Sequence, residues 1–509
     1  MMLTLLQKLY HIRLLTLTGL LGLLEAMLTT GINLMALLRL AAKLHPDRLA
    51  ATSEREQLTY IQLWQQAESL ALALHLEFEV RSHQKVAIIC RNHPAAIKTL
   101  FAASRLGAHV FLLNPEMSAS QILALEERLC FDLLVYDEPL APVFASAALK
   151  SKSLPAYHPN DHSIDRLSSS SASRQVPLKK VEAGNIVVLT GGTTGQAKSA
   201  SRKPSLFNYL PPFLALLNQA QLDQYQSLYI ATPICHGHGL AFLLIGVLLG
   251  VEMYFTERFE ASRACALIAA QQIQVMTVVP LMLQRMLKLD SESLSSLRCI
   301  ISGSALLSPA LAQETLNLLG PILFNLYGTS EAGFSLIGTP AIISRKPEAL
   351  GKPIQGVRVK IVNKTGQEVD ERVIGCLCIR SAWTSNRKKW IETGDLAYRD
   401  ADGDIFLCGR ADDMIVSGGE NVYPLELENV LIQHPEVDSV AVVGIPDPEF
   451  GQRLKAVVIP KPGARLDQAT LLNWLKPRVA RYQMPALIDF RDELPYTALG
   501  KLDKKSLRS

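Results

Sequence analysis

The arrangement of short apolar segments and longer helical ones constrains the fold of this chain more than any other feature. Val86–Cys90 and Val110–Leu113 have the length and apolar content of buried strands, and Ala95–Leu106 between them has the length of a helix and ends before a glycine. Strands that alternate with helices in this way build a parallel sheet covered by helices. The sequence therefore predicts an α/β fold.

The alternation of strands and helices continues along the chain, and beyond residue 351 a different pattern of secondary structure replaces it. After a serine-containing stretch at 142–180, which we interpret as a surface connection, apolar strands are predicted at Ile186–Leu189, Val275–Val279 and Cys299–Ile301. Beyond residue 351, short strands separated by turns predict a small β-rich subdomain. A compact α/β segment then follows in the last hundred residues.

The length of 509 residues is too great for one compact core. We expect an apolar N-terminal helical segment at 1–44. A large N-terminal domain of parallel α/β subdomains, together with the β-rich subdomain, is expected at 45–411. A small C-terminal α/β domain is expected at 412–509, separated from it by the polar stretch around 410–413.

The N-terminal segment leaves several interpretations open. Lys8 and Arg13 precede the apolar run Leu14–Leu24, as in a secretion signal, but no convincing cleavage site follows. The run is also too short to span a bilayer. A helix lying on a membrane, an ordinary packed helix, and an exported or spanning segment therefore remain. Peripheral contact of residues 1–40 with the inner face of a membrane is the hypothesis we carry forward.

Charge and cysteine content narrow the function classes. The net charge of +4 is small for this length and gives no reason to expect nucleic acid as a partner. The eight cysteines form no CxxC pair and do not cluster with histidines, so we expect neither a zinc site nor a disulfide framework. A cytoplasmic location fits this cysteine content.

A loop rich in glycine and threonine follows the predicted strand at 186–189. It reads Thr190-Gly191-Gly192-Thr193-Thr194-Gly195-Gln196-Ala197-Lys198. Glycines let backbone N–H groups turn toward an anion, threonine hydroxyls add donors, and the lysine supplies a positive charge for phosphate oxygens. The lysine does not directly follow a glycine, so this is not a Walker A loop. A phosphate-binding loop and a flexible turn are the alternatives.

This loop resembles the phosphate loop of the adenylate-forming (AMP-binding) superfamily, which includes acyl-CoA synthetases, luciferases and nonribosomal peptide adenylation domains. The usual pattern is Ser/Thr-Ser-Gly-Thr-Thr-Gly-x-Pro-Lys-Gly, and the chain departs from it at Gly191, Ala197 and Ser199. By this resemblance, the loop residues that bind ATP or AMP are Thr190, Gly192, Thr193, Thr194, Gly195 and Lys198.

Further motifs follow in the order of that superfamily, namely Asn325–Glu331, Thr393–Leu396, Gly409–Asp413 and Ser417–Pro424. The resemblance implies that Tyr327 flanks adenine, Thr329 contacts the α-phosphate and Glu331 binds Mg²⁺. Mg²⁺ prefers one or two carboxylates together with phosphate oxygens. The other nucleotide-binding positions implied are Gly303, Ser304, Ala305, Asn325, Gly328, Asp395 and Arg410.

Two of these motifs, Gly409–Asp413 and Ser417–Pro424, and a further one at Pro495–Lys501 also imply a mobile C-terminal domain. By resemblance, Asp412 is the hinge about which that domain rotates, and Lys501 is the catalytic lysine of the adenylation step. Gly418 and Gly419 would let the pantetheine arm of CoA pass close to the backbone. The implied reaction joins a carboxylate and ATP to give acyl-AMP and pyrophosphate, and then transfers the acyl group to a thiol.

The substrate class is indicated by the stretch around Thr232–Gly239, which resembles the element that lines the acyl site. His236 takes the position of the aromatic residue or histidine found there, and we count it with Lys501, Thr329 and Glu331 as a catalytic candidate. No acidic residue in Ala241–Val251 could meet an amino group, which favours a fatty or other apolar acid.

The N-terminal half resembles a bacterial branch of long-chain fatty acyl-CoA synthetases. The segments Val86–His93 and Leu112–Pro115 carry this resemblance. We therefore predict an AMP-forming fatty acid–CoA ligase that uses ATP, Mg²⁺ and CoA. Two alternatives remain: loading of a carrier-protein phosphopantetheine, and a weakened lipid- or nucleotide-binding relative. The altered phosphate loop and a short stretch between Gly375 and Thr393 motivate the second alternative.

Overall fold

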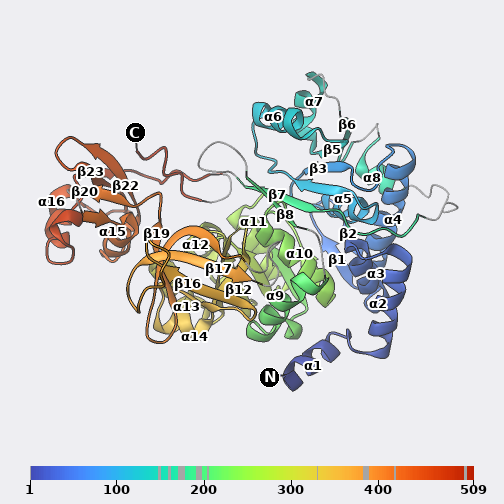
Figure 1. Cartoon of the computed structure of the whole chain (residues 1–509), viewed down its shortest axis with the longest axis horizontal. Coiled ribbons are helices and arrows are strands. Elements are labelled where there is room, and N and C mark those ends of the chain that lie inside the picture. The colour runs from blue at the N-terminus through green and yellow to red at the C-terminus, as the bar shows by residue number, and fades with distance from the viewer. Residues whose placement is uncertain are drawn as a thin grey trace. The chain divides into compact units, whose positions relative to one another are not determined.

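A computed structural model describes residues 2–146, 151–158, 162–169, 178–190, 198–202, 206–329, 331–381, 389–417, 420–497 and 501–508. The chain divides into two compact units. The first comprises residues up to Val278 together with Leu289–Ile301. The second comprises Val279–Lys288 and most of the chain from Ser302 onward. Figure 1 shows the elements of both units.

The N-terminal segment is helical, as predicted, and consists of α1 (Met2–His11), α2 (Leu17–Thr30) and α3 (Leu34–Leu44). Side-chain caps set where the last two begin: Thr16 accepts the N–H of Gly19, and Asn33 accepts the N–H of Ala36. Both helices are rich in leucine, but α3 buries most of its residues and α2 does not. Among the described residues, no helix is long and apolar enough to cross a membrane.

A six-stranded sheet forms the first half of the first unit, and its strands run parallel except for the edge hairpin β7–β8. In spatial order the strands are β6 (Lys152–Pro155), β5 (Leu133–Tyr136), β3 (Lys85–Ile89), β4 (His109–Leu112), β7 (Ile186–Thr190) and β8 (Lys198–Arg202). The helices of this region are α4 (Tyr60–Leu76), α5 (Pro94–Arg105), α6 (Ala119–Leu129), α7 (Ala141–Ser146) and α8 (Ile164–Ser169), with the 3₁₀ turn η1 (Glu138–Leu140). The predicted parallel α/β fold is confirmed.

The interpretation of 142–180 as a surface connection is wrong for its described parts. Strand β6 pairs with β5 and buries Leu154, and helix α8 buries Ile164 and Leu167 where it packs against α4. Each element is only four to six residues long and buries two or three side chains at most. Such short elements carry too few apolar positions for a period to be recognised in the sequence.

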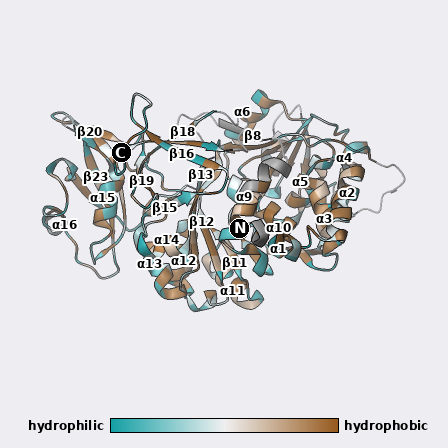
Figure 2. Cartoon of the chain, turned by 60° about the horizontal axis from the view of Figure 1, so that its bottom comes forward, coloured by the Kyte–Doolittle hydropathy of each residue, from teal (hydrophilic) through white to brown (hydrophobic). Residues whose placement is uncertain are grey.

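The rest of the first unit is a second group of mainly parallel strands with helices. In spatial order the strands are β2 (Gln57–Thr59), β1 (Leu49–Thr52), β10 (Glu252–Tyr254), β9 (Ser227–Ile230), β11 (Val275–Val278) and β12 (Cys299–Gly303). The helices and turns are α9 (Leu206–Gln219), η2 (Leu222–Gln224), α10 (Gly237–Leu249), α11 (Ala261–Gln271) and η3 (Glu292–Leu294). Helix α12 (Pro280–Asp290) follows β11 in the sequence but belongs mostly to the second unit. Helix α10 is almost entirely hydrophobic (Figure 2).

The second unit contains the predicted β-rich subdomain as a run of antiparallel strands. In spatial order they are β13 (Leu323–Thr329), β14 (Gly333–Gly338), β15 (Ala349–Pro353), β19 (Ile405–Arg410), β18 (Ile391–Arg399), β17 (Gly375–Ser381) and β16 (Val357–Val362). Helices α13 (Pro309–Leu319) and α14 (Pro340–Arg345) accompany them.

The C-terminal part of the second unit has its own small sheet, as predicted. Its strands are β21 (Glu420–Val422), β20 (Ile415–Ser417), β23 (Gly451–Pro460), β22 (Val437–Asp447) and β24 (Leu487–Phe490), the last paired with β23. Helices α15 (Pro424–Leu431) and α16 (Gln468–Leu475) and the 3₁₀ turn η4 (Arg481–Gln483) complete it. Leu431, Val442 and Leu471 lie in its buried core.

Candidate active site

The strand register of the second unit brings three predicted nucleotide-binding residues together. Asp395 on β18 is the register partner of Arg410 on β19, and the hydroxyl of Tyr327 on β13 donates a hydrogen bond to the Asp395 carboxylate. The Arg410 guanidinium donates to Asp395 (3.1 Å) and to the carbonyl of Thr393 (3.0 Å). We call these three residues the Tyr–Asp–Arg cluster.

Burial and charge perturb this cluster. Asp395 is only 7% exposed, and this burial raises the pKa of its carboxyl, although Tyr327 and Arg410 oppose the shift. Burial first, and the neighbouring Asp395 carboxylate second, raise the pKa of Tyr327 well above its usual value. The phenol therefore stays protonated and serves as a donor to the carboxylate.

Glycine is required beside the cluster. Gly394 adopts a φ of 75°, which side chains disfavour, and a Cβ there would lie 2.9 Å from the Arg410 guanidinium. The hydroxyl of Thr393 accepts the N–H of Asp395 at 3.1 Å and so fixes the turn. Thr393 is a positioning residue, a role that was not predicted from the motif Thr393–Leu396. The sequence signal for it was the placement of a turn-forming threonine two residues before a carboxylate.

The charged groups of the Tyr–Asp–Arg cluster affect the pKa of the Lys501 ammonium group. Loss of surrounding water and the Arg410 guanidinium lower this pKa, and the Asp395 carboxylate opposes them. The side chains of Asp412 and Arg410 are also paired, at 3.1 Å. The second unit therefore brings together four residues predicted from three separate parts of the sequence: Asp395, Arg410, Asp412 and Lys501.

The predicted Mg²⁺ and phosphate contacts lie on the β13–β14 hairpin. The hydroxyl of Thr329 accepts the N–H of Ala332 at 3.0 Å, and Glu331 is exposed in the turn. Gly328 lies so near the neighbouring strand that a Cβ would come within 2.4 Å of the carbonyl oxygen of Gly333. Glu331 takes part in none of the ion pairs among the described residues, and its binding of Mg²⁺ stays a prediction.

The remaining nucleotide candidates of this unit lie in two places. Gly303 ends β12, and Ser304 after it has a left-handed φ of 67°, followed by Ala305. Asn325 on β13 is buried, and its amide donates to the carbonyl of Ala349 at 3.3 Å. The side chain of Asn325 is therefore engaged in holding β13 beside β15.

Several predicted residues belong to the first unit or lie outside the described residues. Thr190 ends β7 and Lys198 begins β8, and the two are register partners in the hairpin. The described residues do not include Gly192, Thr193, Thr194, Gly195, Gly418 and Gly419. His236 is the residue preceding α10, and it is half-buried.

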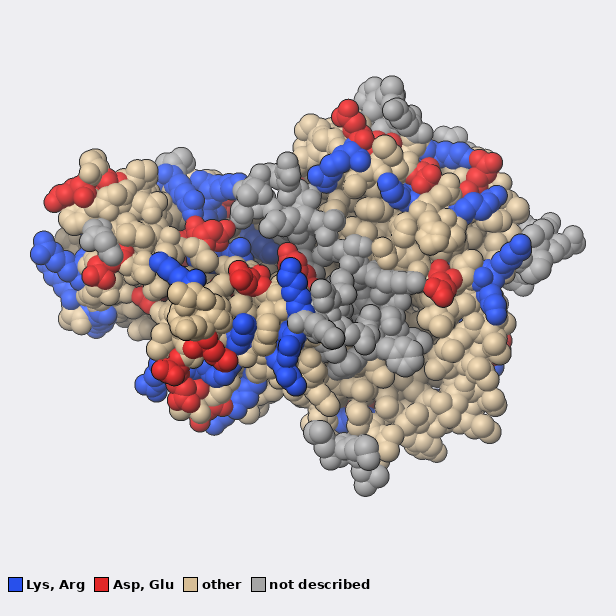
Figure 3. Space-filling model, viewed as in Figure 1, with Lys and Arg blue, Asp and Glu red and all other residues tan. Residues whose placement is uncertain are grey.

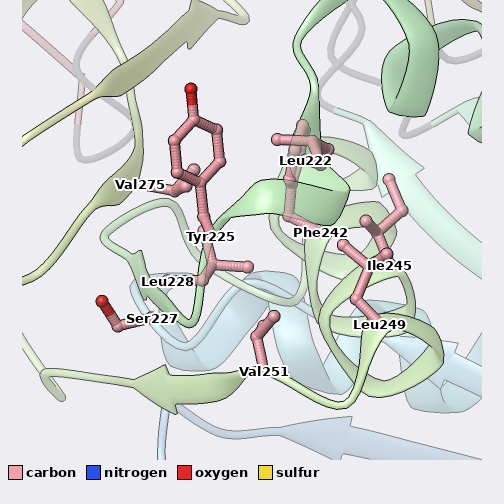
Figure 4. A pocket seen from close by; sticks show the side chains of 9 residues that line it. All are labelled: Leu222, Tyr225, Ser227, Leu228, Phe242, Ile245, Leu249, Val251 and Val275. Atoms are coloured by element: carbon pink, nitrogen blue, oxygen red, sulfur yellow. The ribbon is translucent and has the colours of Figure 1, made fainter. Parts of the chain in front are cut away.

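An apolar pocket lies against α10 in the first unit (Figure 4). It is lined by Leu222, Tyr225, Ser227, Leu228, Phe242, Ile245, Leu249, Val251 and Val275, none of which is charged. Phe242, Ile245 and Leu249 share one side of α10 at helical spacing. His238 precedes them on that side with its ring 5.3 Å from that of Phe242, and burial lowers the pKa of His238 to about 4. The sequence had shown that Ala241–Val251 lacks acidic residues, but it had not predicted this pocket.

One cysteine does lie beside a histidine, contrary to our expectation. Cys90, His93 and Asp137 place ligand-type atoms within 4.8 Å of one another in the first unit. However, His93 Nε2 bonds to Asp137 (2.7 Å), and its Nδ1 accepts the N–H of Ala96 (3.2 Å) at the start of α5. Both imidazole nitrogens are thus in use, and burial raises the pKa of the Cys90 thiol. The group caps a helix. It was missed because Asp137 is distant in sequence.

A family comparison decides what this arrangement is. The sequence model described as "AMP-binding enzyme" matches residues 38–387, and that of the "AMP-binding enzyme C-terminal domain" matches residues 426–501. The chain belongs to the AMP-binding enzyme family. The AMP-binding match covers more than half of the chain, and the predicted membership of the adenylate-forming superfamily is confirmed.

Individual relatives agree with this assignment. An indoleacetate–CoA ligase of Aromatoleum aromaticum is 30% identical over 92% of this chain and 96% of its own length. A medium/long-chain-fatty-acid–CoA ligase of Mycobacterium tuberculosis is 31% identical over 63% of this chain and 60% of its own length. The structure of o-succinylbenzoate CoA synthetase from Bacillus subtilis with its acyl-adenylate intermediate has a TM-score of 0.80 and 25% identity, covering 93% of this chain and 98% of that one.

The comparisons also fix the fold and the cofactors. The chain shares with these AMP-binding enzymes a large N-terminal and a small C-terminal domain. The expected ATP, Mg²⁺ and CoA are those that adenylate-forming CoA ligases use. The chain is therefore an acyl-CoA ligase of the adenylate-forming type.

Proposed function

We propose that this AMP-binding enzyme activates a fatty or other apolar carboxylic acid with ATP and transfers the acyl group to CoA. The Tyr–Asp–Arg cluster, with the charge of Lys501 beside it, is the observation that carries the proposal. In this proposal residues 45–411 form the AMP-binding domain, and residues 412–509 form the domain that moves about Asp412.

The cluster suits a nucleotide for electrostatic reasons. An ionised carboxylate accepts hydrogen bonds at several lone pairs, so Asp395 can accept from ribose hydroxyls while Arg410 still holds it. Arg410 and Lys501 supply positive charge for an anionic α-phosphate that a carboxylate must attack. The attacking carboxylate displaces pyrophosphate, and the acyl-AMP formed is then cleaved by a thiol with release of AMP.

Glu331 and Thr329 are proposed at the phosphate end of the site. Glu331 would hold Mg²⁺, which neutralises phosphate charge when it is bound. Thr329 would donate its hydroxyl proton to the α-phosphate, while one lone pair of the same oxygen accepts the N–H of Ala332. The phosphate loop from Thr190 to Lys198, with Gly192, Thr193, Thr194 and Gly195, would hold the β- and γ-phosphates.

The substrate class is supported by α10. His236 stands at its start, and the pocket residues Phe242 and Leu249 lie about 9 and 20 Å further along the helix at 1.5 Å per residue. The lining is uncharged, which favours an apolar group over a second carboxylate or an amine. An acid whose head lies near His236 must be long to reach it, which favours a fatty acid.

A pyrophosphate-release assay tests the proposal. Acids of increasing alkyl length, indoleacetate and an amino acid are each supplied with ATP and Mg²⁺, with and without CoA. We expect release with the longer alkyl acids, and a CoA thioester only when CoA is present. Preference for indoleacetate would contradict the fatty substrate. Acyl-AMP that accumulates with CoA but is consumed by a phosphopantetheine-bearing carrier protein would favour the carrier-loading alternative. If no acid caused pyrophosphate release, the alternative of a weakened lipid- or nucleotide-binding relative would be favoured.

The N-terminal helices support a peripheral membrane contact. Of the 20 exposed large hydrophobic residues of the described chain, nine lie between residues 6 and 32. Leu17, Leu21, Leu24 and Leu28 form one stripe along α2, where they are 50–75% exposed. The surface over α2 and α3 carries few charges in the view of Figure 3. Isolated exposed leucines are ordinary, whereas a continuous stripe needs an apolar partner.

We propose an anionic lipid surface as that partner. The only charged residue of α2, Glu25, is neutralised by Arg39 (2.6 Å) and Lys43 (2.7 Å). Residues 1–48 carry five lysines and arginines against two acidic residues, and one of the five, Lys8, is paired with Asp223 at 2.6 Å. The remaining positive excess complements anionic headgroups.

Flotation with vesicles tests the membrane contact. The wild type should float with vesicles that contain phosphatidylglycerol, more weakly with neutral ones, and not after Leu17, Leu21, Leu24 and Leu28 are all changed to Ser. The same change at Leu289, Leu306 and Leu318, which are exposed singly, is the control. A wild type that stays unbound and sediments as a dimer would show that a second copy covers the stripe instead.

A further inference from the structure

Lys501 is held by a short antiparallel segment at the end of the chain. Tyr496 and Leu502 form a β-bridge, and the N–H of Thr497 donates to the carbonyl of Lys501 at 2.7 Å. The Thr497 hydroxyl accepts the N–H of Lys501 at 3.3 Å. These contacts fix the backbone of Lys501 relative to residues 495–497, but they do not by themselves fix that segment relative to the rest of the unit.

The residues after Lys501, which we call the tail (502–508), are anchored in two ways. Leu507 is fully buried against Val443 and Val457 of the C-terminal sheet. Two cations of the tail then converge on one carboxylate: Arg508 lies 3.0 Å and Lys504 3.5 Å from Asp413. Lys504 also lies 3.5 Å from Glu428 of α15.

The ion pairs of Asp413 lie at the junction before the C-terminal domain. Asp413 directly follows Asp412, the proposed hinge, whose carboxylate binds Arg410 on the nucleotide side. Two neighbouring carboxylates at the junction therefore hold different partners: Asp412 holds the Tyr–Asp–Arg cluster, and Asp413 holds the tail. A backbone rotation at Asp412 would carry Asp413 with it, and Asp413 would carry the tail and Lys501.

We propose that Asp413, Lys504 and Arg508 are positioning residues that couple the junction to Lys501 for the adenylation step. This inference rests on the proposed function, since it concerns the placement of the adenylation lysine. The three residues do not touch the reacting atoms. Their loss would leave Lys501 present but placed correctly for a smaller fraction of the time.

The size of the effect follows from the exposure of the pairs. The Arg508 and Lys504 side chains are 47% and 27% exposed, and pairs of this kind contribute modestly to a conformational equilibrium. We expect Arg508→Ala to lower the adenylation rate about threefold, and Asp413→Asn, which removes the ion pairs with both Lys504 and Arg508, about tenfold. Arg508→Lys keeps the charge and should restore most of the rate.

Two half-reactions measured on the full-length enzyme test the inference. Adenylation is measured as the exchange of pyrophosphate into ATP that depends on the carboxylic acid substrate. Thioester formation is measured as the consumption of synthetic acyl-AMP that depends on CoA. Asp413→Asn and Arg508→Ala should slow the first and leave the second within twofold of wild type. Arg465→Ala is the control, because Arg465 is an exposed arginine of the same domain with no part in the tail contacts.

A double substitution separates positioning from a general structural effect. If Asp413 acts through Lys501, adding Asp413→Asn to Lys501→Ala should cause no further loss of exchange. A full additional tenfold loss, equal losses in both half-reactions, or a loss in Arg465→Ala as large as in Arg508→Ala would overturn the inference. A wild type that shows no exchange with any acid would instead refute the proposed function, and this inference with it.

Discussion

The Tyr–Asp–Arg cluster of the second unit and the apolar pocket of the first are built in opposite ways. The cluster consists of three polar side chains, each with an individual hydrogen bond or ion pair, on strands whose register sets their distances. The pocket consists of nine side chains in contact with no directed bond among them. Directed charge-assisted bonds are strong and few, whereas apolar contacts are weak and many. Substitutions should therefore abolish activity at the cluster and redirect specificity at the pocket.

The largest effect is expected at the lysine beside the cluster. Lys501→Ala removes positive charge from the forming bond between the acid and the α-phosphate, so adenylation should fall about 10²- to 10³-fold. Thioester formation from supplied acyl-AMP should be spared, because the lysine is proposed to leave the site for that step. Both are measured as half-reactions. Equal loss in the two would contradict the division of labour between them.

Asp395→Asn should come next and should separate activity from stability. The amide donates where the carboxylate accepts, so ATP-dependent activity should fall about 10²-fold. Burial raises the pKa of Asp395, which means that its ionised form is less favourable in the folded chain than in the unfolded one. At pH 7 the carboxylate is ionised in both states, so the neutral variant should unfold at a higher temperature than wild type.

The pH dependence of that difference provides its control. As the pH falls through the raised pKa of Asp395 in the folded state, the carboxyl of the wild type becomes protonated. The wild-type protein then regains the stability that it had lost by burying the ionised form. The gap in unfolding temperature between Asp395→Asn and wild type should therefore narrow toward acid pH. A difference in unfolding temperature that widens toward acid pH, or an Asp395→Asn variant less stable than wild type at pH 7, would contradict this. Either result would show that the ion pair with Arg410 stabilises the folded chain by more than the burial of the carboxylate destabilises it.

The pocket should respond by changing what is bound. Phe242→Leu enlarges it, and the ratio of kcat/KM for long over short alkyl acids should rise about tenfold, since one or two methylene groups are worth about that much. The KM for ATP should not change. Phe255→Leu is a matched control, since Phe255 is equally buried in the same unit but does not line the pocket. An identical shift in both variants would mean that the pocket does not hold the acyl tail.

The sequence predicted these two regions unequally, and the reason is physical. Asp395, Arg410, Asp412 and Lys501 are predictable because a nucleotide requires particular functional groups at particular spacings, and the structure brings them together. The pocket was not predictable, because the same leucine and phenylalanine pattern on α10 would serve equally well for core packing. The fold was also predicted unequally. The bounds of β3, α5 and β4 were predicted to within about one residue, whereas β6 and α8 are too short to show a hydrophobic period in the sequence.

Long-range partners were the other gap in prediction. The contacts of Cys90 and His93 with Asp137 join residues more than 40 positions apart, and those of Asp413 with Lys504 and Arg508 join residues more than 90 apart. A single sequence gives no indication of such pairs, because each member alone has the pattern of an ordinary surface charge or core residue. Only the register of the sheets and the folding back of the tail bring them together.

The smallest effect is expected at the third member of the cluster. Tyr327→Phe keeps the aromatic ring, which is proposed to flank adenine, and removes only the hydroxyl that donates to Asp395. Arg410 still holds the carboxylate, so the KM for ATP should rise only about fivefold with kcat nearly unchanged, which corresponds to one ordinary hydrogen bond. Tyr398→Phe is the control, because Tyr398 lies on β18 with Asp395 but stacks on Phe406, with ring centroids 4.8 Å apart. A fall in kcat as large as that of Asp395→Asn would mean that the hydroxyl, and not Arg410, holds the carboxylate in place.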